Sequence, residues 1–272
     1  MSQFVLQNET IIRLGFFLGV LALIAAWEVL NPRRVLTQNK LVRWYSNIGI
    51  VALNTIALRV VFPITAAGFA ILAEQKSWGL FHNLSFSFGL KVLLSVIVLD
   101  LAIYLQHVMF HAVPALWRLH RMHQADLDFD VTTGARFHTI EILLSMAIKF
   151  SVIFVIGAPA ISVIIFEVLL NATSMFNHGN IFLSPKFDRY LRWLVVTPDM
   201  HRVHHSIYMN ETNSNFGFNL PWWDRLLGTY RSTPKDGHEK MTIGTEFFRE
   251  PKYLKLHWLL AQPFLRNRDN AE

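Results

Sequence analysis

Histidine is the residue whose number and spacing in this chain point most directly to chemistry. Nine of the twelve histidines lie between residues 107 and 205. They form three groups at spacings of one helical turn or less, with two single residues between the groups: His107-x-x-x-His111, His120-x-x-His123, His138, His178 and His201-x-x-His204-His205. Imidazole is the commonest metal ligand in proteins and suits iron, zinc and copper. We therefore predict that these nine residues are the ligands of a centre with more than one metal ion.

Five further side chains are predicted to lie next to the ligands and orient them without binding the metal: Asp100, Tyr104, Gln124, Glu141 and Asp199. At about 100° per helical residue, Asp100 and Tyr104 share one face with His107 and His111. Such groups can accept a hydrogen bond from the ring nitrogen that does not bind metal, which fixes the tautomer and the plane of the ring. Asp100 has an alternative role, as the ion-pair partner of Arg59 within the membrane.

Other kinds of site are excluded or disfavoured by the composition. The chain has no cysteine, so thiolate metal sites and disulfides are excluded. It has no H-E-x-x-H sequence of the kind found in zinc proteases, and no P-loop, serine elbow or dinucleotide-binding glycine motif. The two single residues, His138 and His178, could each be ligands or hydrogen-bonded core histidines.

Long apolar segments must position this histidine set. Hydrophobic residues make up 53% of the chain and charged residues only 16%, well below the usual quarter. Spans are predicted at residues 11–30, 48–73 and 85–106, and residues 140–176 read as a helical hairpin broken at Gly157-Ala158-Pro159. The fold class is therefore an all-α integral membrane protein with about three transmembrane helices, a membrane hairpin and a helical cap that carries the histidines.

Positive charge predicts the orientation of these spans. Arg33, Arg34, Lys40 and Arg43 lie between the first two spans, whereas the loop at 74–84 carries only Lys76, which Glu74 offsets. Positive loops mark the cytoplasmic side, so the histidine site is expected there, in a bacterial inner membrane or the endoplasmic reticulum. The same bias explains the net charge of +6 better than nucleic-acid binding does.

We expect one domain over residues 1–272, because the sequence shows no internal repeat, low-complexity run or flexible linker. Within it, residues 1–84 would form N-terminal membrane helices, 85–232 the catalytic core and 233–272 a C-terminal cytoplasmic tail. The break between the first two parts falls just before the span that leads into the first histidine pair.

From Asp100 to Tyr230 the sequence resembles the fatty acid hydroxylase (sterol desaturase) superfamily of membrane oxygenases. The motifs that carry this resemblance are Asp100-x-x-x-Tyr104-x-x-His107-x-x-x-His111, Trp117-Arg118-Leu119-His120-Arg121-Met122-His123, Arg136-Phe137-His138, Asn177-His178-Gly179-Asn180, Asp199-Met200-His201-Arg202-Val203-His204-His205 and Trp223-Asp224-Arg225-Leu226-Leu227-Gly228-Thr229-Tyr230. One position departs from the family pattern: the second motif usually ends H-x-x-H-H, and here its last position is Gln124. An amide oxygen is a poorer iron ligand than imidazole, so Gln124 could weaken one ion or open a coordination position.

The resemblance implies a centre of two iron ions, with zinc possible in purified material. Such a centre activates O₂ and hydroxylates or desaturates a lipid C–H bond, which side chains alone cannot do. It also implies an external electron donor, since the sequence shows no fused redox segment. The substrate stays open among sterol, fatty acyl chain, ether lipid and carotenoid. The competing interpretations are a membrane metal transporter or metal-storage protein, and a zinc-loaded inactive homologue.

Overall fold

The computed structural model describes residues 2–266, and helices are its only regular elements over that range, apart from two isolated β-bridges. The α-helices and the short 3₁₀-helices (η) follow in chain order: α1 Ser2–Gln7, α2 Glu9–Leu30, α3 Lys40–Val61, α4 Ala66–Gln75, η1 Leu80–His82, α5 Phe88–Ala112, α6 Pro114–Gln124, η2 Thr133–Ala135, α7 Thr139–Ile156, α8 Ala160–Asn177, α9 Pro185–Leu191, α10 Pro198–His204, α11 Met209–Thr212, α12 Trp222–Leu226, α13 Gly237–Lys240, η3 Pro251–Leu254, α14 Leu256–Ala261 and η4 Gln262–Phe264.

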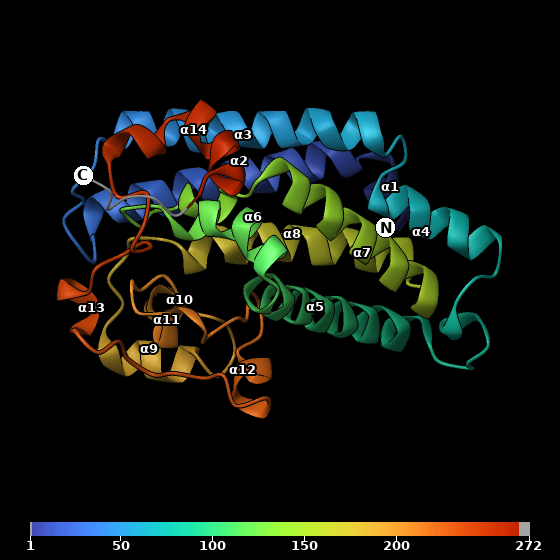
Figure 1. Ribbon diagram of the computed structural model, residues 1–272. Coiled ribbons are helices and arrows are strands. Elements are labelled where there is room, and N and C mark those ends of the chain that lie inside the picture. Colours follow the sequence, from blue (N-terminus) through green and yellow to red (C-terminus); the bar gives the residue numbers. More distant parts are fainter. Residues whose placement is uncertain (1, 267–272) are drawn as a thin grey trace.

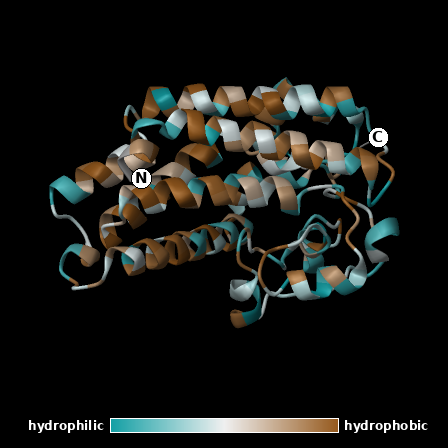
Figure 2. Cartoon of the chain, turned by 180° about the vertical axis from the view of Figure 1, so that it is seen from behind, coloured by the Kyte–Doolittle hydropathy of each residue, from teal (hydrophilic) through white to brown (hydrophobic). Residues whose placement is uncertain are grey.

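Five helical segments are long and apolar enough to cross a membrane: Glu9–Leu30, Lys40–Gln75, Phe88–Ala112, Thr139–Ile156 and Ala160–Asn177. They lie side by side as a bundle, and the short helices α9 to α13 gather at one end of it as a cap (Figure 1). Apolar residues dominate the bundle and polar residues the cap (Figure 2). The arrangement agrees with the predicted all-helical fold.

The boundaries predicted for the second span, residues 48–73, are wrong. The helix begins earlier, at Lys40, because its first turns pack on the polar segment between α6 and α7, where Arg43 is fully buried. It is also interrupted after Val61, and α4 starts only at Ala66. Pro63 explains the break, since proline lacks the backbone donor and forces the preceding residue, Phe62, into an extended conformation.

The predicted hairpin is present as α7 and α8, and its turn is at Gly157-Ala158-Pro159. Gly157 closes α7 in the left-handed conformation, with φ of 67°. A Cβ atom at this glycine would come within 2.6 Å of the Trp78 carbonyl oxygen. The hairpin turn and the loop after α4 therefore meet at the end of the bundle that lies away from the cap.

Buried polar contacts join the bundle to the segment between α6 and α7. The Arg43 guanidinium donates to both carboxylate oxygens of Asp126, at 2.8 and 2.9 Å, and to Asp130 at 2.5 Å. On α2, Glu28 Oε1 accepts from the backbone N–H groups of Val131 and Asn180, at 2.7 and 2.8 Å. These contacts fix the ends of α2 and α3 beside the histidine-bearing segments.

Candidate metal centre

The structure brings eight of the nine predicted ligands together in two groups of four: His107, His111, His120 and His204, and His123, His178, His201 and His205. Within each group, one nitrogen from every ring lies within 4.8 Å of the others. The rings come from α5, α6, the end of α8 and α10 with the residue that follows it. Segments nearly one hundred residues apart in sequence thus meet at the junction of bundle and cap.

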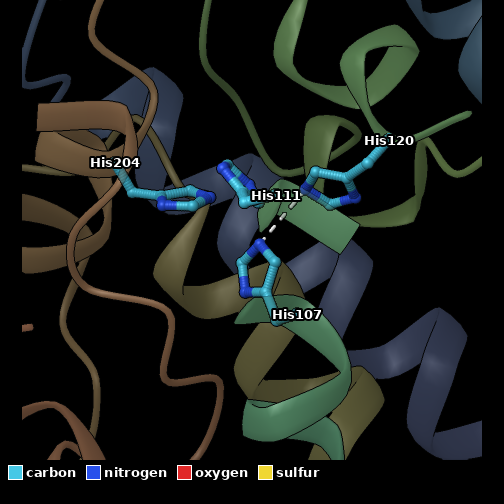
Figure 3. Close-up of side chains that lie close together, drawn as sticks. All are labelled: His107, His111, His120 and His204. Carbon is cyan, nitrogen blue, oxygen red and sulfur yellow. Dashed lines mark hydrogen bonds between the residues drawn. The ribbon is translucent and has the colours of Figure 1, made fainter. Parts of the chain in front are cut away.

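The first group directs its Nε2 atoms inward and its Nδ1 atoms outward (Figure 3). The Nδ1 atoms of His107 and His204 donate to the Phe216 and Ser214 carbonyl oxygens, at 2.8 and 2.7 Å. His120 Nδ1 donates to Glu141 Oε1 at 2.7 Å, and His111 Nδ1 to Asn213 Oδ1 at 3.1 Å. Because carbonyl and carboxylate oxygens only accept, each Nδ1 carries the proton and each Nε2 keeps its lone pair for a ligand.

The second group is fully buried and repeats the arrangement in part. The Nδ1 atoms of His123 and His178 donate to the Arg136 and Ser174 carbonyl oxygens, at 3.1 and 2.7 Å. Within the described chain, His201 Nδ1 and both ring nitrogens of His205 have no hydrogen-bond partner. Unsatisfied buried ring nitrogens are costly, so one nitrogen of His205 is suited to a ligand that protein groups do not supply.

The distances between facing ring nitrogens suit a cation between them. Nε2 of His107 lies 3.1 Å from Nε2 of His120, and His178 Nε2 lies 3.2 and 3.1 Å from those of His123 and His201. Two lone pairs at that distance repel each other unless a proton or a metal ion lies between them.

Protonation is disfavoured in the second group. Burial, and then the neighbouring rings, hold the pKa of His123, His201 and His205 well below its usual range. Burial lowers the pKa of His178 to about 3. Neutral imidazole is the form that binds metal, so a metal ion fits this donor set better than a proton does.

The two groups adjoin, and both helical motifs divide between them. On α6, His120 belongs to the first group and His123 to the second, with ring centroids 5.1 Å apart. At the end of α10, His204 belongs to the first group, and His201 and His205 to the second. The H-x-x-H-H spacing therefore serves two adjacent positions, which is what a two-ion centre requires.

Gln124 occupies the interior of the first group. Its side-chain nitrogen lies 2.6 Å from His204 Nε2 and 3.5 Å from His120 Nε2. The nitrogen and oxygen of a glutamine amide are assigned from their hydrogen bonds, and a half-turn of the amide would exchange them. Gln124 is thus placed to offer its oxygen to an ion that the first group would hold.

The remaining predicted site residues lie elsewhere. His138 is in neither group: its Nδ1 accepts from the Ile140 backbone N–H, and its Nε2 donates to the Leu260 carbonyl oxygen. Asp199 pairs with Arg33 and Arg202 rather than with a ring of either group.

Asp100 and Tyr104 connect α5 to the cap instead of supporting a ring. Asp100 Oδ2 accepts from Trp223 Nε1 at 2.8 Å, and the Tyr104 hydroxyl contacts Thr229 Oγ1 at 2.8 Å. The alternative pairing of Asp100 with Arg59 is wrong, because Arg59 lies exposed on α3 and forms no ion pair within residues 2–266.

Most of the groups that orient the rings leave no signal in the sequence. Four of the six Nδ1 partners are backbone carbonyl oxygens, which every residue carries: those of Phe216, Ser214, Arg136 and Ser174. Only Glu141 and Asn213 use side chains, and the sequence singled out Glu141. Asn213 lies in the polar run from residue 210 to 215, which is the one signal that could have indicated it.

A cavity of about 430 Å³ reaches the first group from within the bundle. His107, His120 and Glu141 are among the residues that line it. Apolar side chains from the long helices line much of its wall, among them Phe17, Leu58, Ile103, Phe110 and Leu170. The centre is therefore accessible to a molecule that lies among the membrane helices.

The family of this chain follows from its similarity to known proteins. Residues 92–229, which are half of the chain, match the fatty acid hydroxylase family. The chain belongs to the fatty acid hydroxylase family. This result confirms the resemblance seen in the sequence, and the matched range contains both histidine groups.

The proteins similar to this member of the fatty acid hydroxylase family include a lipid hydroxylase and two monooxygenases. The ornithine lipid hydroxylase OlsE of Rhizobium tropici is 27% identical over 92% of this chain and 75% of its own length. The alkylglycerol monooxygenases of Xenopus tropicalis and Homo sapiens are 30% and 26% identical over 50% and 53% of this chain. Those two matches cover only 30% and 31% of the monooxygenases' own lengths. No solved structure matches the chain.

Family membership, the apolar helices and the histidine groups together identify an integral membrane oxidoreductase with metal-binding histidines.

Proposed function

We propose that this protein is an iron-dependent enzyme that uses O₂ to hydroxylate a C–H bond of a membrane lipid. The observation that carries the proposal is the pair of adjacent four-imidazole groups, the first of which contributes His107 and His120 to the wall of a cavity among the membrane helices. Bound iron would supply the oxidising power for an unactivated C–H bond.

The proposed ligands are the eight histidines of the two groups, four to each ion. His138 is left out, because both of its ring nitrogens are engaged by backbone groups away from the rings. Iron is favoured over a transported ion because the histidines gather at one end of the bundle, whereas a transport pathway needs ionisable groups through the membrane depth.

The protein's own groups orient the ligands and hold the protons of the rings. The Nδ1–H donors keep each Nε2 lone pair directed inward, and the Glu141 carboxylate gives His120 a charge-assisted bond. Burial of the rings, together with the apolar walls of the cavity, limits the access of water to the first group.

A membrane lipid is the proposed substrate class. The cavity opens among membrane helices, and the relatives' names state hydroxylation of an ornithine lipid and mono-oxygenation of alkylglycerols. Hydroxylation is therefore proposed ahead of desaturation. Ornithine lipids are the first substrates to test, since the match to OlsE extends over nearly the whole chain.

The electron donor and the orientation are part of the proposal. Each hydroxylation needs two electrons beyond those that the substrate gives, so a separate redox partner is expected. The positive loop between the first two spans favours a cytoplasmic centre. We further propose a single domain in which residues 85–232 form the catalytic core.

The direct test combines metal analysis with lipid profiling. Protein purified in detergent should contain about two iron ions per chain, as the donor set of two four-histidine groups requires. Cells that express it should gain a lipid heavier by one oxygen atom, and cells with the His107→Ala variant should not. Zinc without iron, together with no O₂ consumption and no new lipid, would overturn the proposal in favour of an inactive homologue.

A further inference from the structure

Consecutive helices α2 and α3 both line the cavity, yet they hardly contact each other. Helix α2 packs on α8, whereas α3 packs on α7 and α14. The cavity wall includes three residues of α2 and four of α3: Arg13, Leu14 and Phe17, and Val51, Asn54, Thr55 and Leu58. The cavity therefore extends to the lipid-facing side of the bundle between these two helices.

The outermost wall residues mark an opening. Leu14 is 55% exposed, and Thr55 is also exposed, although both line the cavity. Next to Leu14, Arg13 is held by Glu9 at 2.8 Å and by Glu167 of α8 at 3.0 Å. This ion-pair cluster fixes α2 against α8.

The opening lies at the depth of lipid acyl chains. Leu14 is fourteen residues from Glu28, and Thr55 is twelve residues from Arg43, which correspond to about 21 and 18 Å along the helices. Glu28 and Arg43 both bind the segment between α6 and α7, at the cap end of the bundle. Since the hydrocarbon core is about 30 Å thick, an opening at this depth faces acyl chains rather than head groups or water.

We propose that the substrate reaches the centre laterally, through an opening between α2 and α3 with Leu14 and Thr55 at its rim. Its occupant is an acyl chain of a membrane lipid, which passes Phe17 and Phe110 to reach His107 and His120. The inference rests on the proposed function in taking the substrate to be a lipid, but the opening itself can be tested without turnover.

The chain has no cysteine, so a Ser145→Cys variant would carry a single thiol on the cavity wall. In lipid nanodiscs, an apolar maleimide should label this thiol, and a charged, water-soluble thiol reagent should label it much more slowly. Adding Leu14→Trp should slow the apolar labelling several-fold. The matched control is Leu18→Trp, because Leu18 is similarly exposed at 52% and does not line the cavity.

A second pair guards against a folding defect in the first. Thr55→Trp should slow labelling as Leu14→Trp does, whereas Ile56→Trp, at an exposed position off the cavity, should not. Equal labelling by the charged reagent, or no effect of either rim variant, would overturn the lateral opening. If the rim variants slow labelling but the wild-type protein oxidises no lipid, the opening stands and the proposed function fails.

Discussion

At the residue scale, the outward partner of each ring decides what its inner nitrogen can do. Six of the eight rings donate Nδ1–H to a protein oxygen, and this directs the lone pair of Nε2 toward the centre of its group. Glu141 is the only charged group among these partners, and it is buried. Its effect on metal binding should therefore exceed that of an amide in the same place.

Glu141→Gln should weaken metal binding by about 10–100-fold, since it replaces a charge-assisted partner of His120 with a neutral one. Competition with a graded series of chelators measures the change. Asp199→Asn is the control, because Asp199 contacts arginines rather than the ligand rings. Equal affinities for the wild-type and Glu141→Gln proteins would contradict this role.

His204→Ala should lower the bound iron from about two ions to about one per chain and abolish lipid oxidation, because it removes a ligand of the first group only. His138→Ala should keep the iron content, since this ring lies outside both groups. Elemental analysis of both membrane-inserted variants checks the assignment. Full iron in the His204 variant would count against it.

At the scale of helices and loops, the buried charge of Asp126 and the turn at Gly157 determine where the histidine-bearing segments lie. The Asp126 carboxylate is fully buried between α3 and the loop after α6. Burial alone would raise its pKa, but the Arg43 and Arg136 guanidiniums hold the pKa of this carboxyl below its usual range. The same loop carries the Arg136 carbonyl that orients His123.

Asp126→Asn should lower the free energy of unfolding by about 3–5 kcal/mol, because it leaves the Arg43 charge buried with only part of its compensation. Thermal unfolding in detergent measures the loss. Glu239→Gln, at a side chain that is 73% exposed, should change stability by less than about 0.5 kcal/mol. Comparable losses in the two variants would show that the buried pair has no special role.

Gly157→Ala should lower stability by about 1–2 kcal/mol through its left-handed backbone alone, and by more through the clash with the Trp78 carbonyl. Gly89→Ala is a suitable control, since a Cβ atom there meets open space near the start of α5. The same unfolding assay compares them, and an unchanged Gly157 variant would contradict the turn geometry.

At the scale of the whole molecule, the bundle places its two loop-bearing ends far apart. The cap and the histidine groups lie at one end, and the hairpin turn meets the loop after α4 at the other. If the long helices cross the bilayer, these ends face opposite compartments. The positive loop beside the cap is the reason for proposing that the cap lies on the cytoplasmic side.

Single-cysteine variants should show this orientation. A thiol at Lys76→Cys, in the exposed loop after α4, should react with an impermeant reagent added outside intact cells. A thiol at Glu239→Cys, in the exposed part of the cap, should react only after the membrane is opened. The reverse pattern would place the centre on the outer side and contradict the assignment.

The sequence by itself determined the class of the molecule and most of its chemistry. Apolar segments of membrane length predicted the long helices, because hydrophobic length depends only on local composition. Histidine spacing predicted the metal centre and, through its motifs, the family. The sequence also predicted the hairpin turn, since Gly157 can adopt the left-handed backbone that ends a helix and Pro159 cannot continue one.

Only the tertiary structure decided how the rings divide and which of them stand apart. The Arg136-Phe137-His138 motif resembles a ligand-bearing segment of the family, but the path of the chain directs the His138 ring to the Leu260 carbonyl instead. Asp100 shares a helical face with His107, yet the cap approaches that face and binds it through Trp223. Periodicity fixes the direction of a side chain on its own helix, whereas its partner depends on which distant segment packs there.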